Sequence, residues 1–157
     1  MKTALWVIGK TSFSYLDEGM ALYQKRLRRY LPFQLEIIPD IKNAKNLPSA
    51  QLKLKEGQAV LSRLKDGDHL VLLDEQGQMK SSEAFARFMD QQMMQSRKRL
   101  IFLVGGAYGF DEAIYQRANA KLSLSKMTFS HQMVRLFFIE QLYRAMTILR
   151  NEPYHNS

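Results

Sequence analysis

The residues that could bind a ligand through their backbone gather in one short loop. Three of the eight glycines fall within Gly105–Gly109, directly after the apolar run Leu100–Val104. Glycine lets a ligand approach the backbone closely, and α/β proteins bind ligands in loops that follow the carboxyl ends of strands. The cluster is equally consistent with a tight turn between a strand and a helix. It does not form the G-x-G-x-x-G fingerprint of dinucleotide-binding proteins, so a nicotinamide enzyme has little support.

Side chains that could move a proton or stabilise an anion lie close to the C-terminus. Arg144 stands in an apolar stretch, where arginine is seldom buried without a partner. It is equally suited to an i,i+4 pair with Glu140 and to an anion contact at a subunit boundary. The tail Asn151–Ser157 carries Tyr154 and His155. Such a tail is either disordered, as chain ends usually are, or folded over a site.

The elements that must position these residues alternate between strand and helix. Strands are expected at Thr3–Ile8, Phe33–Ile38, His69–Leu73, Leu100–Val104 and Lys121–Ser125. Helices are expected at Ser14–Leu31, Ser49–Leu64, Phe110–Ala118 and His131–Arg150. A further helix is expected to begin at Ser81 or Ser82, with Glu83 in its first turn. Asp40–Pro48 is expected to be a loop, and Asp74–Lys80 a turn around Gly77. Strands that are apolar on both faces belong in a parallel sheet covered by helices. The order therefore predicts a three-layer α/β fold, as one domain over residues 1–157.

The last helix is apolar around nearly its whole circumference from Met133 to Leu149. A helix on the surface of a monomer would show one apolar stripe and a broad polar face. A terminal helix is rarely buried in the centre of a domain, so its second face is expected to meet another subunit in a two-fold dimer. The alternative is a helix buried centrally within one domain. At about 100° per residue, His131 and Arg135 share one edge of this helix.

Composition excludes several classes of protein and favours a polyanionic partner. The net charge of +8 favours contact with RNA or DNA over a merely soluble basic protein. The absence of cysteine excludes disulfides, thiolate metal sites and thiol nucleophiles. No apolar run reaches the length of a secretory signal or a membrane span, so a cytoplasmic protein is expected. The basic clusters Lys25–Arg29 and Arg97–Arg99 could contact phosphates, although a solvated helix face and a charged strand entry explain them as well.

Five segments in order make the chain similar to the ribosomal RNA large-subunit methyltransferase H family, within the SPOUT superfamily of knotted methyltransferases. They are Gly105-Gly106-x-x-Gly109, Leu122–Phe129, His131-Gln132-Met133-Val134-Arg135, Glu140-Gln141-Leu142-Tyr143-Arg144-Ala145 and Pro153-Tyr154-His155. One departure is Ser130, where the family usually has proline before the histidine. The resemblance covers the whole chain.

The resemblance implies a parallel α/β sheet with a C-terminal trefoil knot, in a homodimer that binds S-adenosylmethionine at the knot. Members of the family methylate N3 of a pseudouridine in 23S ribosomal RNA of the assembled ribosome. Carried over to this sequence, the cofactor positions are Leu73, Gly105, Leu124, Ser125, Lys126, Met127, Thr128 and Phe129. Because three of these segments end expected strands, they are expected to meet at one edge of the sheet.

Methyl transfer to a ring nitrogen requires alignment of the reacting atoms and removal of a proton, and it requires no metal. We expect His155 to be the base or to orient the substrate, and Arg144 to stabilise the developing anion. Tyr154 is expected to stack on a flipped base. His131 and Arg135 are expected to hold RNA or the partner subunit. The absence of cysteine disfavours transfer to a pyrimidine carbon.

Two rival functions stay open at this point. A module that binds structured RNA without chemistry explains the charge, but it does not explain the glycine loop together with the terminal Tyr154-His155 pair. A methyltransferase that acts on transfer RNA or on a ribose oxygen keeps the pocket and changes the substrate. Binding of labelled S-adenosylmethionine separates the first rival from an enzyme, and mass spectrometry of the ribosomal RNA decides the second.

Overall fold

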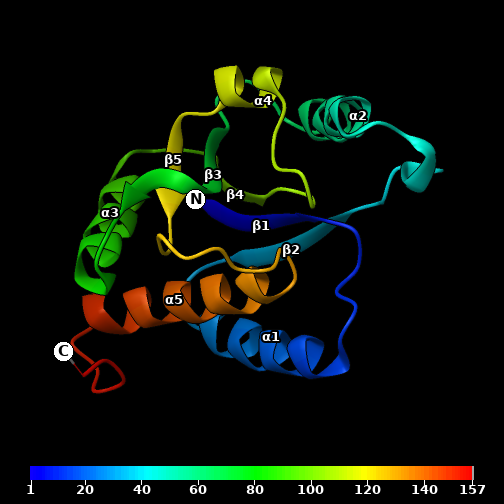
Figure 1. The fold of residues 1–157 in the computed structure, drawn as a ribbon. Helices are drawn as coiled ribbons and strands as arrows, with labels where there is room; N and C mark the ends of the chain where they lie inside the picture. The colour runs from blue at the N-terminus through cyan, green and yellow to red at the C-terminus, as the bar shows by residue number, and fades with distance from the viewer. Residues whose placement is uncertain (157) are drawn as a thin grey trace.

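A five-stranded parallel sheet forms the centre of the computed structural model, which describes residues 1–156 (Figure 1). Its strands are β1 (Lys2–Ile8), β2 (Phe33–Ile38), β3 (His69–Met79), β4 (Arg99–Val104) and β5 (Ala120–Ser123). They lie in the order β2-β1-β4-β3-β5, and each neighbouring pair is parallel. The expected parallel sheet is confirmed. Ser157, the last residue of the expected tail, lies outside the described residues.

Helices cover both faces of the sheet, which confirms the three-layer architecture. The helices are α1 (Ser14–Leu27), α2 (Ser49–Leu61), α3 (Ser82–Met94), α4 (Glu112–Arg117) and α5 (Met133–Leu149). Figure 1 shows α2 and α4 above the sheet and α1 and α5 below it. Side chains alternate between the faces of a strand, so Leu5 and Val7 join one core while Trp6 and Ile8 join the other. A short 3-10 helix (Ala44–Asn46) lies within the expected loop.

Strand β3 is longer than expected, and the predicted turn at Asp74–Lys80 is wrong. The strand continues to Met79 and pairs a second time with β5, after an irregularity between Leu73 and Gln78. A Cβ at Gly77 would lie 2.7 Å from the backbone nitrogen of Leu122. Glycine is therefore needed here because two backbones approach closely within the sheet, and not because the chain turns.

The helices end within a few residues of the expected positions. Helix α1 ends at Leu27, and not at Leu31, because the amides of Tyr30 and Leu31 both donate to the Leu27 carbonyl and close a turn there. Helix α5 begins at Met133, two residues after His131. Ser81 is the N-cap of α3, since its hydroxyl accepts a hydrogen bond from the amide of Ala84.

Helix α5 is buried centrally within a single chain. It packs against α1 on one side and α3 on the other. Phe138, Ile139 and Leu142 are fully buried, and they belong to the same core as Phe102 of β4. The apolar circumference of the helix is thus covered mainly by its own chain. Met133 and Phe137 of the same helix are 39% exposed, so contact of this face with a second subunit stays a prediction.

Replacing Gly77 with alanine is expected to lower the free energy of unfolding by about 1–3 kcal/mol, because the new Cβ must displace the β5 backbone. Urea unfolding monitored by circular dichroism measures the change. Gly19→Ala is the control. Its Cβ would meet only the flexible methyl groups of Leu136, at 3.1 Å and 3.2 Å, and alanine favours the helix. A Gly77 variant as stable as the Gly19 variant would contradict the close approach.

Candidate functional site

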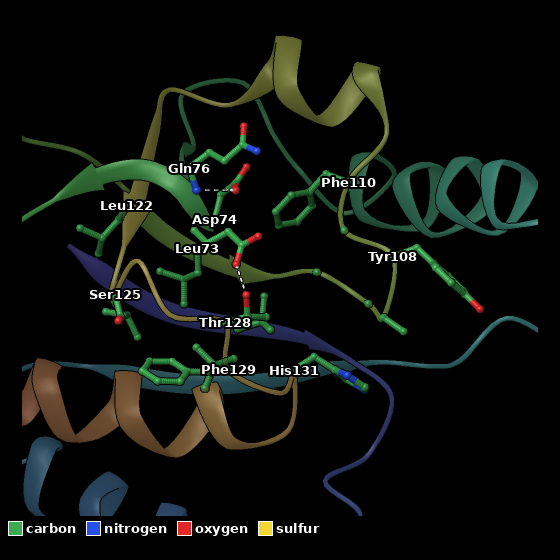
Figure 2. Close-up of a pocket in the computed structure, with 18 of the residues that line it drawn as sticks. Leu73, Asp74, Gln76, Tyr108, Phe110, Leu122, Ser125, Thr128, Phe129 and His131 are labelled. Atoms are coloured by element: carbon green, nitrogen blue, oxygen red, sulfur yellow. Dashed lines mark hydrogen bonds between the residues drawn. The ribbon is translucent and has the colours of Figure 1, made fainter.

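A cavity of about 430 Å³ opens where the middle of β3 meets the carboxyl ends of β4 and β5 (Figure 2). The parallel register places Leu73 of β3 beside Val104 of β4 and Leu122 of β5, so three segments far apart in the sequence meet here. One wall is the stretch of β3 from Leu73 to Gln76, where its pairing with β5 is interrupted, a second is the loop from Val104 to Phe110, and a third is the segment after β5. This is the convergence that the apolar runs predict.

The cavity collects most of the residues to which the sequence assigns cofactor binding. Those that line it are Leu73, Gly105, Leu124, Ser125, Met127, Thr128 and Phe129, and His131 joins them at the start of the last helix. Lys126 belongs to the same segment but does not line the cavity. Figure 2 shows Leu73, Leu122, Ser125 and Phe129 on one side of the cavity and Phe110 on the other.

Hydrogen bonds fix the segment after β5. The hydroxyl of Ser123 donates to the carbonyl of Ser125 at 2.8 Å, and the amide of Met127 donates to the hydroxyl of Ser125 at 2.9 Å. The hydroxyl of Thr128 donates to the carboxylate of Glu75 at 2.6 Å, which ties the segment to the middle of β3 across the cavity (Figure 2). The segment is thereby held in a defined shape without a regular helix or strand.

The glycine loop is both a tight turn and a wall of the cavity. Gly109 has a φ of +84°, a conformation that favours glycine. A Cβ at Gly106 would lie 2.7 Å from the carboxylate of Glu56, which packs beneath the loop from α2. Burial and the nearby charge of Asp40 raise the pKa of Glu56. The loop is therefore compatible with both interpretations, a tight turn between a strand and a helix and a wall of a ligand site.

Polar and apolar side chains line the cavity together, and several of the polar ones are bonded within the protein. The hydroxyl of Tyr115 donates to Asp74 at 2.8 Å, and burial together with this bond raises the pKa of Tyr115 to about 12. Burial and the charge of Arg135 lower the pKa of His131, so this ring is neutral at pH 7. The rest of the lining combines aliphatic and aromatic side chains and backbone with polar side chains such as Gln76 and Tyr108. Such a cavity suits an apolar ring that is held by backbone hydrogen bonds.

The other predicted catalytic residues lie elsewhere. Arg144, Tyr154 and His155 do not line the cavity. Arg144 comes thirteen residues after His131, which corresponds to about 20 Å along a helix. These residues therefore form a second cluster at the far end of α5, and one chain does not bring it to the cavity.

Hydrogen bonds hold Arg144, Tyr154 and His155 together, and these bonds order the C-terminal tail. The guanidinium of Arg144 donates to Glu140 at 2.6 Å and to Nδ1 of His155 at 3.1 Å. It also lies over the ring of Tyr154, whose hydroxyl donates to Glu140 at 2.8 Å. Nε2 of His155 lies 2.8 Å from the carboxylate of Glu83. The predicted pair between Glu140 and Arg144 is confirmed, and the tail is folded against α5 and α3.

Burial and the hydrogen bonds with Tyr23 and Glu140 raise the pKa of Tyr154, so its hydroxyl keeps its proton near neutral pH. The ring of Tyr154 also stands edge-on to that of Tyr143 at 4.7 Å. A second bond secures the tail, because the hydroxyl of Tyr30 donates to Glu152 at 2.6 Å. The terminal residues are thus fixed to both α1 and α5.

Arg135 has a structural position, and the expectation that it holds RNA or a partner subunit is wrong. Its side chain is fully buried. The guanidinium donates to the carbonyls of Ile8 and Gly9, at 2.9 Å and 2.8 Å, and to the hydroxyl of Thr11 at 3.1 Å. These are the carbonyls at the end of β1, which have no further strand residue to pair with. Arg135 therefore joins the start of α5 to the edge of the sheet.

Replacing Arg135 with alanine is expected to lower the free energy of unfolding by about 3 kcal/mol or more, because it leaves buried carbonyls unpaired. Urea unfolding at a fixed protein concentration measures the loss. Arg29→Ala removes an exposed arginine and should change stability by no more than about 0.5 kcal/mol. Equal stability of the two variants would mean that Arg135 does not anchor the sheet edge.

Sequence reasoning missed several residues of these two clusters. The contact between Glu83 and His155 joins residues 72 positions apart, and the sequence indicates only that Glu83 stands in the first turn of a helix. The bond between Thr128 and Glu75 joins residues 53 positions apart. Glu56 carries no motif, although its place beside Gly57 in an otherwise helical segment was a weak signal of close packing.

Among residues 1–156, no three histidine, cysteine or acidic side chains are grouped so as to hold a metal ion. None of the described helices has the length and apolar character needed to cross a membrane.

Comparison with known proteins extends over almost the whole chain. Residues 1–155 match the family described as "Predicted SPOUT methyltransferase". Proteins named ribosomal RNA large subunit methyltransferase H are similar over 156 residues, covering 99% of this chain and 99% of each relative. The identity is 58% for Parabacteroides distasonis, 54% for Christiangramia forsetii and 50% for Bacteroides thetaiotaomicron. With a fold and a cavity of the expected kind, and with this similarity along its full length, the chain belongs to the SPOUT methyltransferase family.

Proposed function

We propose that this chain is a cytoplasmic ribosomal RNA methyltransferase that transfers a methyl group from S-adenosylmethionine to N3 of a pseudouridine in the large-subunit RNA of the ribosome. The observation that carries the proposal is the cavity enclosed by Leu73, Gly105 and the segment Leu124–Phe129. The relatives at 50–58% identity are named for the large-subunit ribosomal RNA. The net charge of +8 suits such a substrate.

The cavity fits the proposed cofactor in size and in chemistry. Its volume of about 430 Å³ lies within the usual range for small-molecule sites. Leu73, Leu122 and Leu124 offer apolar contacts for adenine and for the methionine chain. The backbone of Gly105 and of the segment after β5 offers donors and acceptors for specific hydrogen bonds. S-adenosylmethionine would supply an electrophilic methyl group there.

The proposed fold includes the trefoil knot that the family resemblance implies. The segment Leu124–Phe129 lines one cavity together with β3 residues Leu73–Gln76 and the glycine loop after β4. Threading of the chain through a loop would put the segment in this position. The knot would also explain how residues without regular secondary structure form a stable wall.

We propose that the active site is completed across a homodimer. One chain keeps its cavity and its Arg144–His155 cluster at opposite ends of α5. Beside the cavity, Phe129, Met133 and Phe137 are 38–39% exposed, and the rings of Phe129 and Phe137 lie 5.1 Å apart. A second hollow of about 360 Å³ adjoins them. Two chains packed through this apolar patch with antiparallel α5 helices would put each tail beside the partner's cavity.

In this arrangement each predicted catalytic residue has a role. The cavity aligns the methyl group with the target nitrogen. Arg144 stabilises the negative charge that develops on the base, and its bond to Glu140 orients it for this. Tyr154 offers a ring on which the flipped base stacks. His155 accepts the proton of N3, and His131, at the mouth of the cavity, contacts RNA or the partner.

The C-terminal ends of α1 and α5 form the basic surface best suited to RNA. Arg26 lies over the ring of Tyr23 at 5.5 Å, and Arg150 lies over that of Tyr30 at 4.7 Å. Arg29 is exposed beside them. The second basic cluster is less suited, because Arg99 is bonded to Asp68 and lies over Trp6. The basic cluster Lys25–Arg29 adjoins the C-terminal tail, so phosphate contacts at this cluster would hold the RNA near His155.

Replacing Arg144 or His155 with alanine is expected to leave affinity for S-adenosylmethionine within about twofold, and to lower kcat for methyl transfer by about 100-fold. Calorimetry measures the affinity, and transfer of labelled methyl groups to ribosomes from a strain lacking the gene measures kcat. Lys55→Ala removes an exposed cation on α2 and is the control. Normal turnover in both variants would remove these catalytic roles. If the wild type bound RNA but no S-adenosylmethionine, the chain would be a binding module. Methylation elsewhere would identify another RNA substrate.

Mixing two inactive variants tests whether the site is shared. Gly105→Leu should fill the cavity, and His155→Ala should remove the base. After subunit exchange, half of the dimers are mixed, and each has one intact site, so about a quarter of the wild-type activity should return. Analytical ultracentrifugation would verify the dimer. No recovery in a mixture that has exchanged subunits would show that cavity and tail act within one chain.

A further inference from the structure

Glu83 is the one member of the C-terminal cluster with no role in the proposed reaction. It stands in the first turn of α3, and its carboxylate lies 2.8 Å from Nε2 of His155. Its side chain is 41% exposed, so it is not buried for packing. Its bond to His155 lowers the pKa of Glu83, which is therefore ionised at neutral pH.

The two partners of His155 fix the position of its proton. Arginine carries only donors, so the contact between Arg144 and Nδ1 requires a lone pair on Nδ1. An ionised carboxylate only accepts, so Nε2 must carry the hydrogen that it donates to Glu83. The ring is thus held as the neutral Nε2–H tautomer, with its basic lone pair on Nδ1. That lone pair points at the guanidinium that is proposed to meet the substrate.

We propose that Glu83 is a positioning residue that prepares His155 to accept the N3 proton at Nδ1. This inference rests on the proposed function. The N3–H bond breaks and an H–Nδ1 bond forms, and the electron pair left on N3 would bond to the methyl carbon as the bond from that carbon to the sulfonium sulfur breaks, with its electron pair staying on sulfur. The proton later leaves Nδ1 for water. Arg144 must turn one nitrogen from Nδ1 toward the substrate, and its other nitrogen keeps the bond to Glu140.

Charge balance within the cluster supports this assignment. When His155 takes up the proton, it becomes a cation beside the guanidinium of Arg144, which opposes the transfer. Glu83 faces the new imidazolium, while Glu140 faces Arg144. Two carboxylates thus meet two cations. An orienting carboxylate behind a histidine base also stabilises the imidazolium in well-studied hydrolases.

The test uses Glu83→Gln and Glu83→Ala in the full-length protein. The amide oxygen of glutamine can still accept from Nε2–H, so Glu83→Gln keeps the tautomer but removes the charge. Glu83→Ala removes both. Nitrogen NMR of the free protein reports the tautomer of His155, calorimetry reports binding of S-adenosylmethionine, and methyl transfer to ribosomes reports kcat. Glu112→Gln makes the same change in the first turn of α4 and is the matched control.

We expect the Nε2–H tautomer in the wild type and in Glu83→Gln, and a mixture of tautomers in Glu83→Ala, because without Glu83 the ring is free to turn away from Arg144. Both Glu83 variants should lose about 10- to 100-fold in kcat with unchanged cofactor affinity, whereas Glu112→Gln should match the wild type. A wild-type ring with hydrogen on Nδ1 overturns the inference. So does a normal kcat in Glu83→Gln, even with a loss in Glu83→Ala, because Glu83 would then only fasten the tail. An inactive wild type would instead refute the proposed function itself.

Discussion

All five strands run in one direction, so their carboxyl ends share a single edge, and every feature of the site depends on this. Carbonyl and amide groups at the ends of parallel strands have no further strand residue to pair with, and each must find another partner or stay available to a ligand. At β1 the buried guanidinium of Arg135 satisfies the carbonyls of Ile8 and Gly9. At β3, β4 and β5 the same edge stays open as a cavity. One half of the edge is thus closed by an arginine, and the other half is left for a ligand.

The two halves of the proposed site differ in how they obtain specificity. The cavity relies on backbone groups and apolar side chains, which a short irregular segment can present when bonds such as Thr128–Glu75 hold its shape. The C-terminal cluster relies on charged side chains, which need an ordered support. That support is α5, packed between α1 and α3 against the sheet. The central burial of α5 therefore makes the cluster rigid, and it also separates the cluster from the cavity of its own chain.

Much of the fold was predictable because the relevant signals are local. Leu73 and Val104 close the apolar runs of two expected strands, and the parallel register pairs these two residues directly. The close approach at Gly77 was not predictable, because it depends on the register of β5 against β3, which no local pattern contains. The burial of α5 depends on the order of helices within a layer. Arg135 was misjudged for a related reason, since its partners are carbonyls about 125 residues away.

Charged groups at the C-terminus depend most on contacts that are distant in sequence. The i,i+4 pair of Glu140 and Arg144 follows from helical spacing, so it can be predicted from the sequence. Glu83 joins the cluster only because α3 and the tail both pack against α5, and only its presence gives Nε2 of His155 a partner that accepts a hydrogen bond. A histidine with one arginine neighbour would have a hydrogen-bond partner at one ring nitrogen. The same histidine between an arginine and a carboxylate has a partner at each ring nitrogen, which orients the ring. Its chemistry is therefore a property of the packed helices, and not of the Tyr154-His155 motif alone.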